Sequence, residues 1–469
     1  MSQEDPVDLT ISEALAEMRG GNLSSADYAE AHIERSEKHA GLNAFVSHDW
    51  DSLREAARAA DASGKAGEGL TGIPLVLKDN INTTTLPTSA ATGALRGWTA
   101  AKNAPIADAL FAQGALLGAK GNMHELAFGI TTNNAVTGAS RNPFNPDMIP
   151  GGSSGGVGTA VGARLMPGGI GTDTGASVRL PAALCGIVGY RPTVGRYSGS
   201  GIVPISHTRD TAGPMVRSVA DARLLDAVMS GVPSSGDTAD LKSVRIGVPK
   251  AHFYDDLDPG VAKIAERTLG ALESAGARLA DVELPDIAAL NDAVGFPVAL
   301  YEFKVDLADY LAENGLSLTL EEIHAGVESP DVKGVMGSQL GDEAIPEALY
   351  RQVMSIERPK LQQAYATCFS ENGIDVLLFP TAPLPARPIG EDETVEHNGE
   401  RLPTFTTFIR NTDPASNAGI PGISLPAGLD ADGLPVGMEL DGPAGSDEKL
   451  LAIAQAVEAV LGPGEAPKL

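Results

Sequence analysis

Short apolar runs alternate with segments of helical periodicity along much of the chain. Ile73 to Leu77 form one such run, which predicts a buried strand that ends at Lys78. The segment 259–275 has apolar residues at helical spacing and stops at Gly276, a residue typical of helix ends. The apolar runs "RIGV" and "ARLADVEL" lie on either side of this segment. Strand, helix and strand in succession predict an α/β fold.

The same patterns predict how the chain is organised. Thr10 and Glu13 have capping-box spacing, so a helix begins there, and we expect residues 1–65 to form an N-terminal helical arm. Residues 286–360 are mostly helical in pattern and are interpreted as an insert over the sheet. Because neither an internal repeat nor a strong linker is present, residues 1–469 are expected to form a single large domain.

Composition excludes several classes of protein. Hydrophobic residues make up 43% and charged residues 20%, which is typical of a globular chain. The net charge of -27 would repel nucleic acid and anionic membranes, so neither is expected as a partner. Acidic residues near the start and the lack of any apolar run of ~18 residues argue against a secretory signal or a membrane span. We therefore expect a cytoplasmic protein.

The few cysteines argue against a cysteine-built metal site, and the distribution of glycine indicates where the functional site lies. Cys185 and Cys368 are too few for a disulfide framework or a cysteine-built zinc site. Glycine makes up 54 of 469 residues, about 12% against a usual ~7%. These glycines cluster between positions 114 and 201, where we look for the chemistry.

Within this cluster, Gly151 to Gly156 read "GGSSGG". No lysine follows as in a phosphate-binding loop, and the dinucleotide pattern is absent. Gly151, Ser153 and Gly155 match the GxSxG turn of α/β-hydrolases, which needs a downstream acid and histidine, and His207 would be that base. A serine-rich surface loop is the plain alternative.

A second motif, "GTDTGASVRLPAALCG", adds Ser177. Thr174, Gly175 and Ala176 precede it and are small enough for backbone N–H groups to approach a ligand closely. Residues 177–185 are expected to be helical, which would place Ser177 at a helix N-terminus. Free N–H groups there can bind an oxyanion.

Lys78 in "GIPLVLKDN", the "GGSSGG" loop and Ser177, 24 positions after Ser153, together resemble the amidase signature family. The resemblance runs from about Thr10 to Leu440 and is most specific over residues 70–220, the expected signature core. It implies a mixed, mostly parallel twisted β-sheet with helices on both faces. It also implies that Ser177 is the nucleophile, that Lys78 is the catalytic lysine, and that Ser153 bridges them after a cis peptide bond.

The chemistry implied by the resemblance requires a lysine with a lowered pKa. A lysine in water has a pKa near 10.4, so Lys78 must be buried to be neutral and to accept a proton from Ser153, which accepts one from Ser177. Ser177 would then attack an amide carbonyl and form an acyl-enzyme. Oxyanion stabilisation falls to the backbone N–H groups of Thr174, Gly175, Ala176 and Ser177. No metal or cofactor is required.

Neighbouring residues are expected to support the site. Gly152 adds no side chain beside the cis bond, Ser154 is expected to bind the loop and the lysine, and an ion pair between Asp173 and Arg179 would fix the loop. His124 next to Glu125 is too weak a pattern for a metal site. The segment expected to line the acyl pocket, or else to be core, is Ala127, Phe128, Gly129, Ile130 and Thr131.

Two departures from the family pattern bear on function. Ala176 stands where glycine is common and makes the motif similar to bacterial hydrolases of arylacetamides such as indoleacetamide and mandelamide. Gly121 stands where threonine is usual, so Lys120 and Asn122 receive no catalytic role. The chain is thus expected to hydrolyse a small carboxylic amide, aromatic or arylacetyl, to the acid and ammonia or an amine, with anilides and acyl hydrazides left open.

The sequence leaves other functions as alternatives. One is the glutaminase subunit of a tRNA-dependent amidotransferase, although the acidic charge disfavours an assembly that must meet tRNA. Another is a Ser-His-Asp esterase that uses His207. A scaffold without activity is disfavoured because Lys78, Ser153 and Ser177 are all present. The resemblance also suggests a homodimer.

Overall fold

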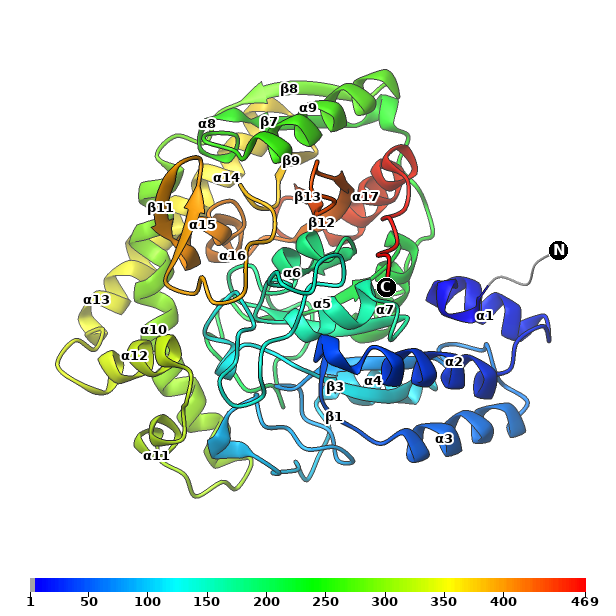
Figure 1. Ribbon diagram of the computed structural model, residues 1–469. Coiled ribbons are helices and arrows are strands. Elements are labelled where there is room, and N and C mark those ends of the chain that lie inside the picture. Colours follow the sequence, from blue (N-terminus) through cyan, green and yellow to red (C-terminus); the bar gives the residue numbers. More distant parts are fainter. Residues whose placement is uncertain (1–4) are drawn as a thin grey trace.

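A computed structural model describes residues 5–469, and its centre is a large twisted sheet (Figure 1). In spatial order the strands of this sheet are β1 (Phe45–His48), β3 (Leu116–Gly121), β2 (Pro74–Lys78), β4 (Gly168–Asp173), β6 (Thr211–Val216), β5 (Val188–Arg191), β12 (Gly422–Leu429), β13 (Pro435–Asp441), β9 (Val376–Pro380), β7 (Arg245–Pro249) and β8 (Arg278–Val282). A separate hairpin pairs β10 (Thr394–His397) with β11 (Glu400–Pro403).

The sheet is mixed, as expected. Parallel pairing is confined to β3–β2–β4 and to β9–β7–β8. The strands between these groups pair antiparallel, as does β1 with β3, so among the described residues the antiparallel pairs outnumber the parallel ones and the sheet is less parallel than predicted. The reason is local for β12 and β13, because a turn as short as residues 430–434 can join only antiparallel neighbours.

Helices cover both faces of the sheet, as predicted. Successive strand residues point to opposite sides, so Leu75 and Leu77 of β2 pack in one core cluster and Val76 packs in another. On the side of Leu75 lie α1 (Ile11–Arg19), α2 (Ser25–Lys38), α4 (Pro105–Ala112), α7 (Val219–Ser230), α9 (Pro259–Ser274) and α17 (Asp447–Leu461). On the other side lie α5 (Gly155–Gly162), α6 (Arg179–Leu184), α10 (Ile287–Glu313), α14 (Arg358–Asn372) and α16 (Asp413–Ala418).

The remaining helices lie at the ends and edges of this arrangement (Figure 1). They are α3 (Trp50–Ala62), α8 (Lys250–Phe253), α11 (Leu320–Ala325), α12 (Pro330–Leu340), α13 (Glu347–Gln352), a π-helical turn (Val353–Glu357) and α15 (Thr404–Ile409). None of the helices over residues 5–469 is both long enough and apolar enough to cross a bilayer.

Several predicted elements are confirmed. Thr10 forms the expected capping box with Glu13 at the start of α1, and the run from Ile73 becomes β2, which is buried throughout. The expected arm also contributes β1 to the edge of the sheet, while its first four residues lie outside the described part of the chain. Residues 287–357 are mostly helical, although the division of the chain into an arm, a core and an insert stays a prediction.

The parallel pairing of β2 with β4 positions the candidate site. Leu77 lies beside Ile170, so the two strands end at the same edge of the sheet. Lys78 ends β2, and Thr172 and Asp173 end β4. Side chains 94 positions apart in the sequence therefore meet there.

Candidate active site

Lys78 is fully buried at the carboxyl end of β2. Its Nζ lies 2.8 Å from Ser153 Oγ and 2.8 Å from Thr172 Oγ1, and it donates to the Thr172 carbonyl at 3.3 Å. Burial lowers the pKa of Lys78 from 10.5 to about 7, and the carboxylates of Asp173 and Asp210 oppose only part of that shift. A lysine in this position is available as a neutral base near pH 7.

The glycine-rich loop lies against neighbouring backbone, and the peptide bond between Gly152 and Ser153 is cis. A Cβ atom on Gly152 would lie 2.8 Å from the carbonyl carbon of Ile130, and one on Gly156 would lie 2.4 Å from the amide nitrogen of Asn122. Real Cβ atoms do not approach backbone so closely. The "GGSSGG" motif therefore allows the loop to pack where side chains have no room.

Ser177 lies two residues before α6 and faces a cavity, with 7% of its surface exposed. Within residues 5–469, the backbone N–H groups of Thr174, Gly175, Ala176 and Ser177 donate no hydrogen bond. All four residues line the cavity, so these donors are available to a ligand.

The expected hydrogen bond between Ser153 and Ser177 is not formed in the described structure. Among the described residues, no hydrogen bond joins Ser153 Oγ to Ser177 Oγ, although the Ser177 carbonyl accepts from the amide of Ser154 at 3.3 Å. Catalytic hydrogen bonds often tighten only when substrate is bound. The structure thus shows the hydrogen bond between Lys78 and Ser153. Ser177 is held next to this pair by the hydrogen bond from the Ser154 amide to the Ser177 carbonyl.

Asp173 and Arg179 form the predicted ion pair, with Arg179 Nε 3.0 Å from Asp173 Oδ2. Arg191 also reaches Asp173 at 2.9 Å, and Arg179 reaches Glu439 at 2.5 Å. Burial by itself would raise the pKa of Asp173, but the two guanidinium groups hold it well below its usual range. Arg179 Nη2 also donates to the Gly175 carbonyl at 3.1 Å, so this buried charge network fixes the segment that carries the free N–H groups.

Ser154 does not make the hydrogen bond to Lys78 that was expected of it. Its Oγ exchanges hydrogen bonds with the backbone of Thr172 and makes none with Lys78 among the described residues. Thr172 Oγ1 is the hydroxyl beside Lys78, and Asn80 Nδ2 donates to it at 3.0 Å. Sequence reasoning missed Thr172 because its contact with Lys78 depends on the pairing of β2 with β4. Its position just before Asp173 in the Ser177 motif was the available signal.

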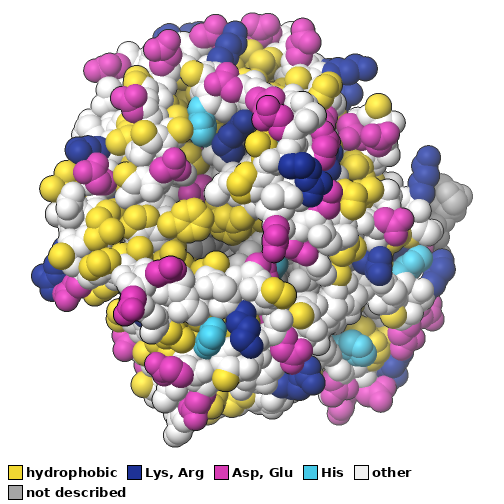
Figure 2. Space-filling view, turned by 60° about the vertical axis from the view of Figure 1, so that its left-hand side comes forward, with side chains coloured by type: hydrophobic (Ala, Val, Ile, Leu, Met, Phe, Trp, Pro, Cys, Tyr) yellow, Lys and Arg dark blue, Asp and Glu magenta, His cyan; other side chains and the backbone are white. Residues whose placement is uncertain are grey.

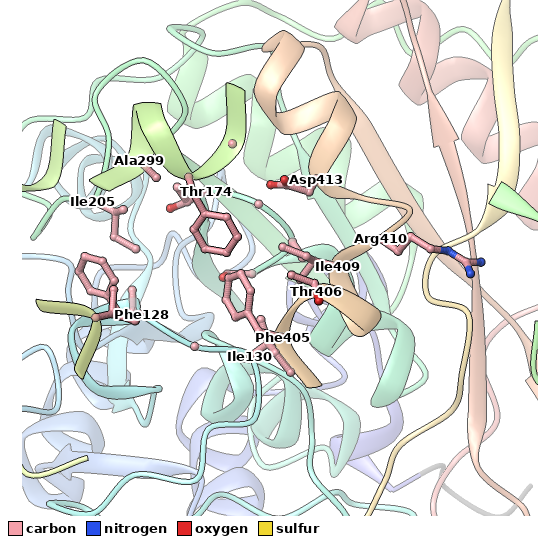
Figure 3. A pocket seen from close by; sticks show the side chains of 18 of the residues that line it. Phe128, Ile130, Thr174, Ile205, Ala299, Phe405, Thr406, Ile409, Arg410 and Asp413 are labelled. Atoms are coloured by element: carbon pink, nitrogen blue, oxygen red, sulfur yellow. The ribbon is translucent and has the colours of Figure 1, made fainter. Parts of the chain in front are cut away.

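The five residues from Ala127 to Thr131 all line the same cavity as Ser177. This cavity has a volume of about 590 Å³. Phe128 and Ile205 lie on one side of it, and Phe405, Thr406 and Ile409 lie on the other (Figure 3). The walls are therefore mostly apolar, and the segments that build them come from distant parts of the chain.

His207, the base required by the esterase interpretation, lies elsewhere. It is not among the described residues that line the cavity, and its imidazole contacts Asp306 at 3.0 Å. His207, Glu302 and Asp306 also lie close enough together to hold a metal ion, but Glu302 already accepts hydrogen bonds from three hydroxyl groups. The arrangement does not support a Ser-His-Asp triad.

The other candidates have structural partners. His124 contacts Asp331 at 2.9 Å, and Glu125 accepts from the Ser329 amide at 2.8 Å, so this pair has no metal-like arrangement. Lys120 is buried near Asp79 at 3.6 Å, and burial lowers its pKa to about 8. Neither Lys120 nor Asp79 lines the cavity in the described structure.

Comparisons with known proteins show the family to which the chain belongs. The model of the family described as Amidase matches residues 27–451. An indoleacetamide hydrolase of Rhizobium radiobacter is 50% identical, with 97% of each chain covered, and a mandelamide hydrolase of Pseudomonas putida is 41% identical, with 98% of this chain and 93% of the relative covered. The crystal structure of a peptide amidase from Stenotrophomonas maltophilia matches with a TM-score of 0.86 at 29% identity, with 98% of each chain covered. The chain therefore belongs to the Amidase family and is a hydrolase of carboxylic amides.

Proposed function

We propose that this enzyme hydrolyses arylacetamides to the arylacetic acid and ammonia through an acyl-enzyme on Ser177. In this proposal Lys78 is the base and Ser153 carries the proton between Lys78 and Ser177. The observation that carries it is the buried Lys78, with its pKa lowered to about 7 and its Nζ 2.8 Å from Ser153 Oγ.

The proton path follows from these contacts. Neutral Lys78 has a lone pair, so its contact with Ser153 can reverse, with Ser153 Oγ–H donating to Nζ. Ser153 then accepts the proton of Ser177 as the Ser177 oxygen attacks the amide carbon. Thr172 Oγ1 and the Thr172 carbonyl accept the remaining N–H groups of Lys78, so the lysine keeps its orientation in both protonation states. Thr172 is thus a positioning residue.

The negative charge that develops on the carbonyl oxygen needs donors. The free N–H groups of residues 174–177 on the cavity wall are suited to this, and one such donor in a preorganised site contributes about 3 to 4 kcal/mol. When the tetrahedral intermediate collapses, the relay runs in reverse and protonates the leaving nitrogen, which departs as ammonia. Water then attacks the acyl-enzyme by the same route and releases the acid. This sequence uses no cofactor.

The choice of an arylacetamide rests on two supports. The relatives at 50% and 41% identity are named for the hydrolysis of indoleacetamide and mandelamide, both of which carry an aryl group near the carbonyl. The walls of the cavity beside Ser177 are mostly apolar, with Phe128, Ile130 and Ile409 among the lining side chains. An apolar cavity favours an aryl group over the polar side chain of glutamine, so the glutaminase function is not favoured.

Release of the leaving group by the purified protein tests the proposal: ammonia from the primary amides, aniline from an anilide and hydrazine from an acyl hydrazide. Phenylacetamide, indoleacetamide, propionamide, glutamine, an anilide and an acyl hydrazide would be compared, with Ser177→Ala as the control. We expect the highest kcat/KM on the two arylacetamides and its loss in the control. Preferred turnover of glutamine, or activity that survives Ser177→Ala, would contradict the proposal.

Two further expectations belong to this proposal and rest on sequence alone. The acidic composition and the family resemblance lead us to propose a cytoplasmic homodimer. Light scattering of the purified protein tests the oligomeric state, and fractionation of cells tests the location.

A further inference from the structure

Two phenyl rings remain unusually exposed at the candidate active site. Phe296 on α10 is 49% exposed and Phe405 on α15 is 36% exposed, and both line the cavity that contains Ser177. Their ring centroids are 5.9 Å apart and the rings are tilted by 39°. Single exposed apolar residues are ordinary, but two adjacent aromatic rings in the wall of a ligand cavity indicate a binding surface.

The exposure of Phe405 does not reflect a poorly packed helix. Thr404, Thr407 and Phe408 of α15 are buried, and Phe408 is fully enclosed in a core cluster. The helix is therefore anchored by one face and presents Phe405 on another, and Figure 3 shows this ring extending from α15 into the cavity.

Phe296 lies next to a buried ion pair near the segment before the nucleophile. The carbonyl of the adjacent Gly295 accepts from Arg209 Nη1 at 2.7 Å, and Arg209 Nη2 donates to Asp413 Oδ1 at 2.6 Å. Asp413 Oδ1 lies only 2.8 Å from the position of a Cβ atom on Gly175. A buried ion pair thus fixes the backbone that carries Phe296, and its Asp413 carboxylate lies beside Gly175.

Several apolar side chains also surround the two rings. Ala288, Ala299 and Leu300 of α10 line the cavity with Phe296, and Ile409 of α15 lines it with Phe405. On the face that carries α10 and α15, Figure 2 shows a band of hydrophobic side chains beside a hollow. Two phenyl rings in such walls can contact a third aromatic ring by offset or edge-to-face packing.

We propose that Phe296 and Phe405 form an aromatic clamp, a pair of adjoining rings that together pack against one side of the aryl group of the substrate, and that these two residues set the preference for aryl over aliphatic amides. The clamp rests on the proposed function, because it requires an arylacetamide substrate. It assigns specificity to α10 and α15, which lie outside the sequence motifs that carry Lys78, Ser153 and Ser177.

The test compares phenylacetamide with propionamide, which has the same amide group but no ring. In Phe296→Ala and Phe405→Ala, kcat/KM for phenylacetamide is expected to fall about tenfold through a higher KM, because each variant removes an aromatic contact and its apolar area. The value for propionamide should change little. Phe296→Tyr keeps the ring and should keep the preference.

Val305→Ala is the matched control, because Val305 also lies on α10, is 46% exposed, and is not among the described residues that line the cavity. Binding of phenylacetamide to each clamp variant in a Ser177→Ala background, measured by calorimetry, should weaken by the same factor as KM rises. A thermal melt of each variant verifies that it is folded.

The possible results distinguish a failure of the clamp from a failure of the proposed function. Wild-type protein that turns over propionamide as well as phenylacetamide overturns the arylacetamide proposal and the clamp with it. A wild-type preference for phenylacetamide that survives both alanine variants overturns the clamp alone. Equal losses on the two substrates also overturn it, because a clamp on the ring cannot affect a substrate that has none.

Discussion

Replacement of Lys78 by methionine separates the chemical role of the lysine from its effect on stability. Lys78 is fully buried, and its pKa falls from 10.5 to about 7 mainly because of burial. At about 1.36 kcal/mol per pKa unit, this fall corresponds to about 5 kcal/mol by which the folded protein disfavours the charged lysine. Methionine has a similar shape and carries no charge, so Lys78→Met removes both that cost and the base.

The pH dependence of stability follows from the direction of the shift. Below pH 7 the lysine is protonated in both the folded and the unfolded protein, so burial of the charged lysine lowers the free energy of unfolding of the wild type by the full amount. Between pH 7 and about 10 only the unfolded chain binds the proton, and the free energy of unfolding of the wild type should therefore rise by about 1.4 kcal/mol per pH unit relative to Lys78→Met.

Two assays test this reasoning. Urea unfolding of both proteins between pH 6 and pH 10 gives the stability difference, and ammonia release gives the activity. The wild-type kcat/KM should rise with pH through one ionisation near 7, while Lys78→Met should lose about 10³-fold or more at every pH. Unfolding free energies that run parallel across this range, or a wild-type activity that does not change near pH 7, would refute the depressed pKa.

Three more substitutions test the packing of the glycine-rich loop, the buried charge network and the role of His207. Gly152→Ala should lower the free energy of unfolding, measured with urea, by about 1 to 3 kcal/mol, because its Cβ would lie 2.8 Å from the Ile130 backbone. Gly41→Ala should leave the free energy of unfolding unchanged, because no atom lies within 4 Å of its Cβ. Equal effects of the two substitutions would contradict the packing argument. Arg179→Gln leaves the buried Glu439 without a cation, while Asp173 keeps Arg191, and it should lower the free energy of unfolding by about 3 to 5 kcal/mol; a wild-type urea midpoint would show that the ion pair with Glu439 is dispensable. His207→Ala should leave kcat/KM on phenylacetamide unchanged, and loss of activity would revive the esterase interpretation.

The parts of the fold that local patterns specify could be predicted from the sequence. The run from Ile73, the capping box at Thr10 and the helix stop at Gly276 are each determined by neighbours within a few positions, and the corresponding elements formed where expected. The ion pair of Asp173 with Arg179 is also local, because the two residues lie six positions apart.

Features that depend on long-range pairing could not be predicted in this way. The contact of Thr172 with Lys78 requires β2 and β4 to be neighbours, and the extent of antiparallel pairing depends on strand order, which periodicity does not report. Phe296 and Phe405 are 109 positions apart in sequence (405 − 296), lie on different helices and meet only in the fold. The cavity wall is built from segments that are far apart in the sequence. The motifs therefore indicated the chemistry but could not predict which residues contact the substrate.

Acyl transfer to hydroxylamine shows whether Ser177 forms a covalent acyl-enzyme. Phenylacetamide and the anilide of phenylacetic acid would be hydrolysed in the presence of hydroxylamine, and the ratio of hydroxamate to free acid measured. If both substrates pass through the same acyl group on Ser177, the two ratios are identical and Ser177→Ala forms neither product. Ratios that differ with the leaving group, or hydroxamate formed by Ser177→Ala, would contradict the account.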